Sequence, residues 1–131
     1  MTEVLRLQET KFKNNNKQVI GCVGENLAAD YLVSSGYKIV ARNWRHKNGE
    51  LDIIALRKNT IVAVEVKTRT GTEFGSPFDA INATKRKRLR ILFGAWLAET
   101  KGKYSIARID GIGIVIVPDI GANIEHIEAI A

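Results

Sequence analysis

The sequence is short of cysteine, proline and long apolar runs, and each shortage excludes a class of protein. The single cysteine, Cys22, cannot form an internal disulfide, and no Cys/His spacing typical of a zinc site is present. The longest apolar stretches, such as residues 112–117, are too short to cross a bilayer. Residues 1–17 are charged and asparagine-rich, unlike a secretory signal. We therefore expect a soluble, cytoplasmic protein with no membrane partner.

Only two prolines are present, and no Pro-rich or Ser-rich linker divides the 131 residues. A chain of this length fits one compact domain with a buried core. Its content of 45% hydrophobic and 26% charged residues is typical of a globular protein. We expect a flexible polar arm over residues 1–17, followed by a single domain over residues 18–131.

The charge balance favours a polyanionic partner. Twenty Lys and Arg against fourteen Asp and Glu give a formal net charge of +6, with a pI near 9.6. A basic protein without such a partner has the same balance, so the clustering of the cations matters more. A group of cations crowds the start of the second expected helix: Lys85, Arg86, Lys87, Arg88 and Arg90. They oppose the helix dipole there, and a bound phosphate backbone would relieve that cost, although a solvated face is the alternative.

The spacing of apolar residues predicts an α/β protein. One helix is expected from Ile20 to about Gly36, and another ends near Thr100 after a cap at Ser76 or Thr84. Strands are expected over Tyr37–Arg45, Glu50–Arg57, Thr60–Thr68, Tyr104–Val117 and Ile124–Ile127. The order helix, three strands, helix, strands implies a mixed β-sheet with helices packed on it.

The second and third expected strands form a hairpin whose two sides differ. If Lys58 and Asn59 make the turn, one side is wholly apolar: Leu51, Ile53 and Ala55 face Val66, Val64 and Val62. On the other side Asp52 faces Glu65, and Lys67 shares their face by strand periodicity. Like charges directly opposed are destabilising, and a divalent cation held by oxygen ligands would explain the pair. The alternative is a solvated patch of ordinary salt bridges.

Such a cluster has the chemistry of metal-dependent phosphodiester hydrolysis. Asp52 and Glu65 would hold Mg²⁺ or Mn²⁺, and Lys67 would steady the attacking water. Glu25, at the rim of the first helix's apolar stripe, is a candidate third metal ligand, and a solvated carboxylate fits its position equally well. If Asn48 and Gly49 make the other turn, Arg45 faces Asp52, either as a phosphate clamp or as a plain salt bridge.

Several motifs, taken together and in this order, resemble the YraN family of small bacterial proteins. They are Gly24-Glu25-Asn26-Leu27-Ala28-Ala29, Gly36-Tyr37, Arg42-Asn43-Trp44-Arg45, Gly49-Glu50-Leu51-Asp52-Ile53-Ile54-Ala55, Val64-Glu65-Val66-Lys67-Thr68-Arg69, Phe74-Gly75-Ser76-Pro77, Lys85 and Arg108-Ile109-Asp110. The resemblance implies a restriction-endonuclease-like three-layer fold of the PD-(D/E)XK nuclease superfamily, similar to archaeal Holliday junction resolvases, which use Mg²⁺ to cut DNA. It matches Asp52 and Glu65 to the metal-binding acids, Lys67 to the motif lysine and Glu25 to an extra acid.

Three hypotheses follow. The first is a Mg²⁺- or Mn²⁺-dependent endodeoxyribonuclease that acts on structured or branched DNA, for which a two-fold homodimer would be suitable. Its candidate nucleic-acid-binding residues are Arg45, Arg69, Lys85, Arg86 and Arg88. The second is a nucleic-acid-binding module that keeps the nuclease fold without turnover. The third is an interaction protein whose polar hairpin end is a subunit contact.

Overall fold

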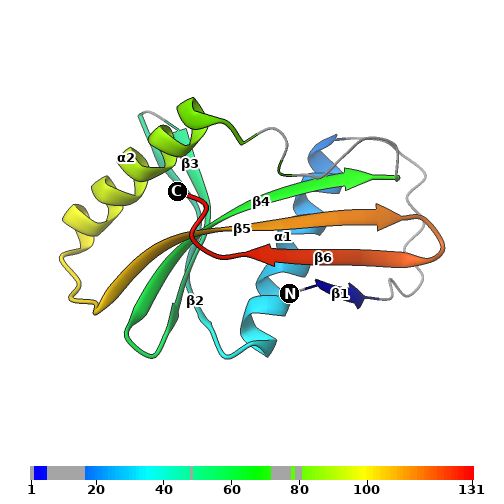
Figure 1. Ribbon diagram of the computed structural model, residues 1–131, viewed down its shortest axis with the longest axis horizontal. Helices are drawn as coiled ribbons and strands as arrows, with labels where there is room; N and C mark the ends of the chain where they lie inside the picture. Colours follow the sequence, from blue (N-terminus) through cyan, green and yellow to red (C-terminus); the bar gives the residue numbers. More distant parts are fainter. Residues whose placement is uncertain (1, 6–16, 48, 72–77, 79–80) are drawn as a thin grey trace.

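The structure, a computed structural model, describes residues 2–5, 17–47, 49–71, 78 and 81–131. Its sheet has six strands, with one helix on each face (Figure 1). The elements are β1 (Thr2–Leu5), α1 (Lys17–Ser34), β2 (Lys38–His46), β3 (Gly49–Arg57), β4 (Thr60–Thr70), α2 (Ala83–Thr100), β5 (Ile106–Val117) and β6 (Gly121–Ile127). The strand order is β1-β6-β5-β4-β3-β2, in which β4 and β5 are parallel and the other neighbours antiparallel. The predicted α/β class and three-layer arrangement are confirmed.

Helix α1 packs closely on one face of the sheet. Its Ala28 and Leu32 are fully buried against β-strand residues that include Val62 and Val64. At Gly24 the helix approaches β4 so closely that a Cβ atom would overlap the side chain of Thr68. This close approach places the next residue, Glu25, beside the sheet.

Helix α2 covers the opposite face. Its buried residues Leu89, Leu92 and Phe93 pack with Ile54 and Ile61 of the hairpin. Because strand side chains alternate between faces, Ile54 contacts α2 while its neighbour Ile53 contacts α1.

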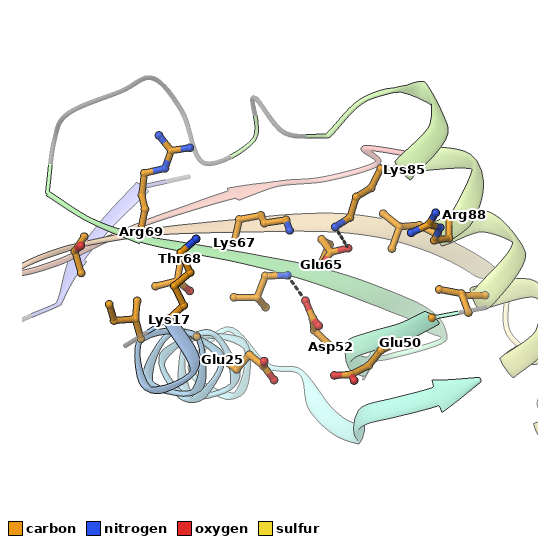
Figure 2. A pocket seen from close by; sticks show the side chains of 17 residues that line it. Lys17, Glu25, Glu50, Asp52, Glu65, Lys67, Thr68, Arg69, Lys85 and Arg88 are labelled. Carbon is orange, nitrogen blue, oxygen red and sulfur yellow. Dashed lines mark hydrogen bonds and ion pairs between the residues drawn. The ribbon is translucent and has the colours of Figure 1, made fainter. Parts of the chain in front are cut away.

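The first turn of α2 differs from expectation. The helix is capped by Asn82, whose side-chain oxygen accepts from the backbone N of Lys85 at 2.9 Å. Thr84, one of the two predicted caps, lies inside the helix, and the other, Ser76, lies outside the described residues. Lys85 therefore sits in the first turn of α2, at the end of the helix nearest to β4 (Figure 2).

The predicted register of the β3–β4 hairpin is confirmed along its apolar part, where Ile53 pairs with Val64 and Ala55 with Val62. The ladder of paired residues stops at Ile53, although β4 continues beside β5 as far as Thr70. The expectation for Leu51 was wrong, because it packs on the α2 face rather than with Ile53 on the α1 face. The two strands thus separate at the end of the hairpin that contains Asp52 and Glu65.

The second turn also differs from expectation. His46 pairs with Gly49, so the turn lies between these two residues, and Arg45 is opposite Glu50. The predicted pairing of Arg45 with Asp52 was therefore wrong. The shift of the turn by one position moves Arg45 along the strand, away from the acid that it was expected to face.

Part of the expected polar arm has regular structure. Thr2–Leu5 forms β1, which pairs with β6 at one edge of the sheet, and α1 already begins at Lys17. The rest of the expected arm, residues 6–16, lies outside the described residues. Among the described residues, neither helix is long and apolar enough to cross a membrane.

Candidate active site

A cleft of about 830 Å³ opens where β3 separates from β4, between the N-terminal halves of α1 and α2 (Figure 2). Four acids line it: Glu25, Glu50, Asp52 and Glu65. Five cations line it as well: Lys17, Lys67, Arg69, Lys85 and Arg88. All the residues predicted for catalysis and metal binding from the sequence are therefore brought to one cleft.

Asp52 and Glu65 form a largely buried carboxylate pair at the centre of the cleft. Oδ2 of Asp52 accepts a hydrogen bond from the backbone N of Val66 at 2.8 Å, and Glu65 is 8% exposed. The β3–β4 ladder ends beside this hydrogen bond, in which the carboxylate takes the backbone donor next to Glu65. Burial, together with hydrogen bonding to and repulsion by Glu65, raises the pKa of Asp52 to about 8. The side-by-side burial of the two carboxyl groups therefore disfavours the charged form of Asp52.

The raised pKa makes the stability of the metal-free protein depend on pH. An acid whose folded-state pKa is raised stabilises the fold below its unfolded pKa, about 3.9, and that contribution is lost as the pH rises through about 8. Asn at position 52 cannot ionise, yet it can accept the same hydrogen bond from Val66. We expect Asp52→Asn to raise the free energy of unfolding by about 1–3 kcal/mol at pH 9 and by less than about 1 kcal/mol at pH 5, where only a small part of the loss has occurred.

Urea denaturation of the metal-free protein at both pH values checks this expectation. Asp30→Asn, which changes an exposed carboxyl on α1, is the matched control and should leave the pH dependence unchanged. An Asp52→Asn curve parallel to that of the wild type between pH 5 and pH 9 would show that the pair is not strained.

Two lysines accompany the acid pair. The Nζ atom of Lys85 lies 3.7 Å from Oε2 of Glu65, and the side chain is 31% exposed. Lys67 lies two residues after Glu65 on β4, and its pKa is lowered by hydrogen bonding to Lys85 and by burial. The centre of the cleft thus holds two carboxylates and two lysines within reach of one another (Figure 2).

Glu25 reaches the same cleft from α1. Burial and the charge of Asp52 raise the pKa of its carboxyl. Asn43, which has a left-handed φ of 52°, links it to β3 when the amide nitrogen faces the acids, donating to Glu25 and Glu50 at 2.9 Å each. Asn43 was not predicted as a site residue. Asparagine tolerates a left-handed backbone better than most residues do, and its presence within an expected strand was the signal that could have pointed to it.

Glu25 does not complete a three-ligand group. Within the part of the chain that the structure describes, no cluster of three or more His, Cys, Asp or Glu side chains is close enough to hold a metal ion. Asp52 and Glu65 alone still match the donor set of Mg²⁺, which is commonly held by one or two carboxylates together with waters and substrate phosphates.

The expected nucleic-acid-binding residues divide into two groups. Arg69, Lys85 and Arg88 line the cleft, whereas Arg86 is exposed on α2 and is not part of the lining. Arg45 is also outside the lining: it is 84% exposed, and its Nε lies 3.2 Å from Glu50. Lys17 also lines the cleft, although it was expected to belong to the polar arm and was not predicted as a site residue.

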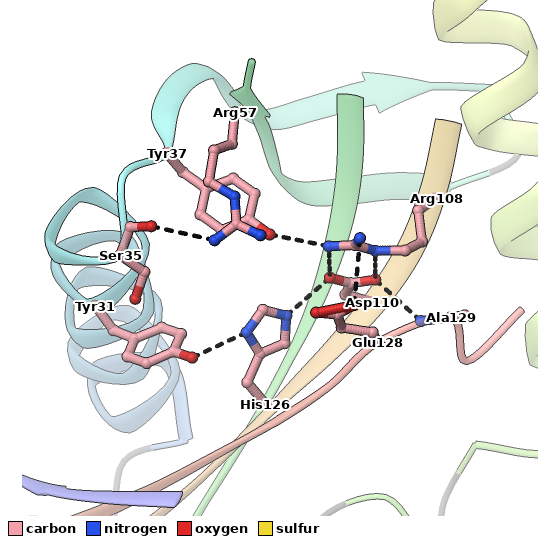
Figure 3. Close-up of polar contacts among 9 residues, drawn as sticks. All are labelled: Tyr31, Ser35, Tyr37, Arg57, Arg108, Asp110, His126, Glu128 and Ala129. Atoms are coloured by element: carbon pink, nitrogen blue, oxygen red, sulfur yellow. Dashed lines mark hydrogen bonds and ion pairs between the residues drawn. The ribbon is translucent and has the colours of Figure 1, made fainter. Parts of the chain in front are cut away.

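Asp110 lies apart from the cleft, in a polar cluster between β5, β6 and α1 (Figure 3). Its carboxylate is fully buried and accepts two hydrogen bonds from Arg108, at 2.7 and 2.9 Å. The Nε2 atom of His126 lies 2.8 Å from the same carboxylate, and the backbone N of Ala129 donates to it at 3.0 Å. The Asp110 carboxylate is thus engaged by contacts within this chain, and we expect it to stabilise the fold.

The family model and the relatives that match this chain carry the same family name. The model of a family described as "Uncharacterised protein family UPF0102" matches residues 24–114, a range that contains the acid pair and both lysines. A "UPF0102 protein" of Nocardia farcinica is 45% identical over 115 residues, which cover 88% of this chain and 91% of that protein. A "UPF0102 protein" of Mycolicibacterium vanbaalenii is 44% identical over 86% of this chain and 93% of its own length. One from Mycobacterium tuberculosis is 45% identical over 83% and 87%.

Proposed function

The chain belongs to the UPF0102 family, which is the YraN family that its motifs resemble, and we propose that it is a metal-dependent endonuclease acting on DNA. The observation that carries the proposal is the buried pair of Asp52 and Glu65 beside Lys67, in a cleft lined by cations. Two buried acids side by side destabilise the fold unless a positive charge compensates them. A divalent cation is a partner that fits their oxygen donors.

Each residue of the centre then has a role. Asp52 and Glu65 would hold Mg²⁺ or Mn²⁺, and Val66 fixes the Asp52 carboxylate through its backbone N. A bound ion would lower the pKa of the water that it binds and would neutralise charge on the phosphate oxygens. Lys67 points into the cleft from the same face of β4 as Glu65 and orients the attacking water or the scissile phosphate (Figure 2).

The cations support a nucleic-acid backbone that passes through the cleft. Lys17 and Arg69 lie on one side of the acid pair, and Lys85 and Arg88 lie on the other (Figure 2). Phosphates bound on both sides would place an internal phosphodiester at the acids, which favours cutting within a strand over cutting at an end. The preference for branched DNA rests on the resemblance to the Holliday junction resolvases.

A second candidate function is a nucleic-acid-binding module without turnover. The observation that favours it is the ion pair between Lys85 and Glu65, in which a protein cation already occupies the acid. This candidate predicts DNA binding that falls steeply with salt, with no cleavage in any divalent metal.

A cleavage assay separates the two functions. The purified protein is incubated with supercoiled plasmid and with a four-way junction, in Mg²⁺, in Mn²⁺ and in EDTA. We expect cleavage only with divalent metal, and faster cleavage of the junction than of a linear duplex of the same sequence. Binding without cleavage in either metal would support the module, and cleavage in EDTA would mean that the protein acts without a metal or that the preparation is contaminated.

A further inference from the structure

Lys85 stands in an unusual position for a lysine. It lies in the first turn of α2, where its backbone N donates to the capping side chain of Asn82. A cation at a helix N-terminus is unfavourable unless its charge is engaged elsewhere. Here the ammonium group extends away from the helix to Glu65, as the dashed contact in Figure 2 shows.

Two lysines already accompany the two acids at the centre of the cleft in the metal-free protein. Asp52 and Glu65 contribute two acids, and Lys67 and Lys85 contribute two basic groups in contact with them or with each other. A divalent cation placed between the acids would add two positive charges next to both lysines. Repulsion is therefore lowest if one lysine moves away when the metal arrives.

Lys85 is the lysine that can move. Lys67 projects from β4, whose backbone pairs with β5 at this position, and its neighbours in the cleft are Glu65, Asp52 and Lys85. Lys85 reaches the acid from a helix, on a flexible four-carbon stem, and is 31% exposed to the open cleft. From that position it can turn toward a phosphate that lies in the cleft near Arg88.

We propose that Lys85 is the counter-cation of Glu65 in the metal-free protein and transfers to a DNA phosphate when the metal binds. The inference rests on the proposed function, because it takes Asp52 and Glu65 as the metal-holding acids. Its consequence is that metal and DNA bind cooperatively. DNA draws Lys85 away from Glu65 and so favours metal binding, and the metal displaces Lys85 from Glu65 and so leaves it available to a DNA phosphate.

Calorimetric titration with Mn²⁺ alone, at the same fixed pH for every variant, tests the first half of the inference. We expect Lys85→Met to bind Mn²⁺ about tenfold more tightly than the wild type. Arg86→Met removes the same charge from the next residue, which is exposed outside the cleft, and should bind as the wild type does. Lys85→Arg keeps the charge and should also remain near the wild type, which separates loss of charge from loss of fold.

The second half is tested by repeating the Mn²⁺ titration with a phosphorothioate duplex that resists hydrolysis. The wild-type affinity for Mn²⁺ should rise by about tenfold with the duplex, and Lys85→Met should lose most of that increase. If the wild type binds Mn²⁺ and cuts DNA but Lys85→Met behaves like Arg86→Met, this inference is overturned and the proposed function stands. If the wild type binds no Mn²⁺, with or without the duplex, both are overturned.

Discussion

Replacing Glu65 by glutamine is expected to lower the rate of metal-dependent DNA cleavage by about a thousandfold, with DNA affinity equal to or tighter than that of the wild type. Glu65 is 8% exposed and lies on β4 beside Asp52. Because the site is buried, solvent water cannot readily replace its carboxylate as a metal ligand. Glutamine keeps its size and one acceptor oxygen but removes the charge that would hold the metal. DNA affinity is kept because a negative charge is lost from a cleft that receives phosphates.

Single-turnover cleavage and equilibrium DNA binding, measured at one salt concentration, check this prediction. The control is Glu99→Gln, which makes the same change at an exposed position near the far end of α2. Cleavage by Glu65→Gln within about tenfold of the wild-type rate, with the same metal dependence, would remove Glu65 from the reaction.

Replacing Asp110 by asparagine is expected to lower the free energy of unfolding at pH 7 by about 3–5 kcal/mol. The side chain is fully buried, and it accepts hydrogen bonds from Arg108 and Ala129 and lies within hydrogen-bond distance of His126. An amide would turn one of its acceptors into a donor that faces other donors, and the guanidinium of Arg108 would lose its buried countercharge. The loss is a large fraction of the stability of a domain of this size.

The hydrogen bonds of Asp110 also predict how the loss in the free energy of unfolding varies with pH. Burial raises the pKa of Asp110, but hydrogen bonds to His126, Arg108 and Ala129 outweigh it and hold the pKa below its ordinary value. A depressed pKa stabilises the fold above the unfolded pKa, about 3.9, and this contribution is lost as the pH falls below that value. The difference between the wild type and Asp110→Asn should therefore shrink in acid.

Urea denaturation between pH 7 and pH 3 measures both quantities. Asp119→Asn, at an exposed turn position with a left-handed φ of 66° that asparagine tolerates, is the control and should cost little. A loss below about 1 kcal/mol for Asp110→Asn would mean that the cluster in Figure 3 is not a determinant of stability.

The sequence predicted the structure correctly where a regular spacing of apolar residues was enough to determine it. Apolar residues at every second position fixed the pairing of Ile53 with Val64 and of Ala55 with Val62, and that register brought Asp52 and Glu65 to one end of the hairpin. Helical spacing likewise located the ends of the helices, since α1 ends at Ser34, near the expected Gly36, and α2 ends at the expected Thr100.

The remaining details depended on single hydrogen bonds that alternation does not encode. The contact of Asp52 with the backbone of Val66 accompanies the end of the ladder, and Leu51 then packs on the opposite face from the predicted one. A turn between His46 and Gly49, one position earlier than expected, gave Arg45 a different partner. Cap preferences alone could not choose Asn82, because serine and threonine nearby offered equally good caps.

The proposed endonuclease activity depends most on the joint binding of one divalent cation by Asp52 and Glu65. A crystal of the protein soaked in Mn²⁺ and examined by anomalous diffraction tests it directly. We expect one peak at about 2.0–2.3 Å from an oxygen of each carboxylate, and no peak there in crystals of Glu65→Gln. A wild-type crystal with no peak between the two acids, at a Mn²⁺ concentration that supports DNA cleavage in solution, would contradict joint binding of the metal by Asp52 and Glu65.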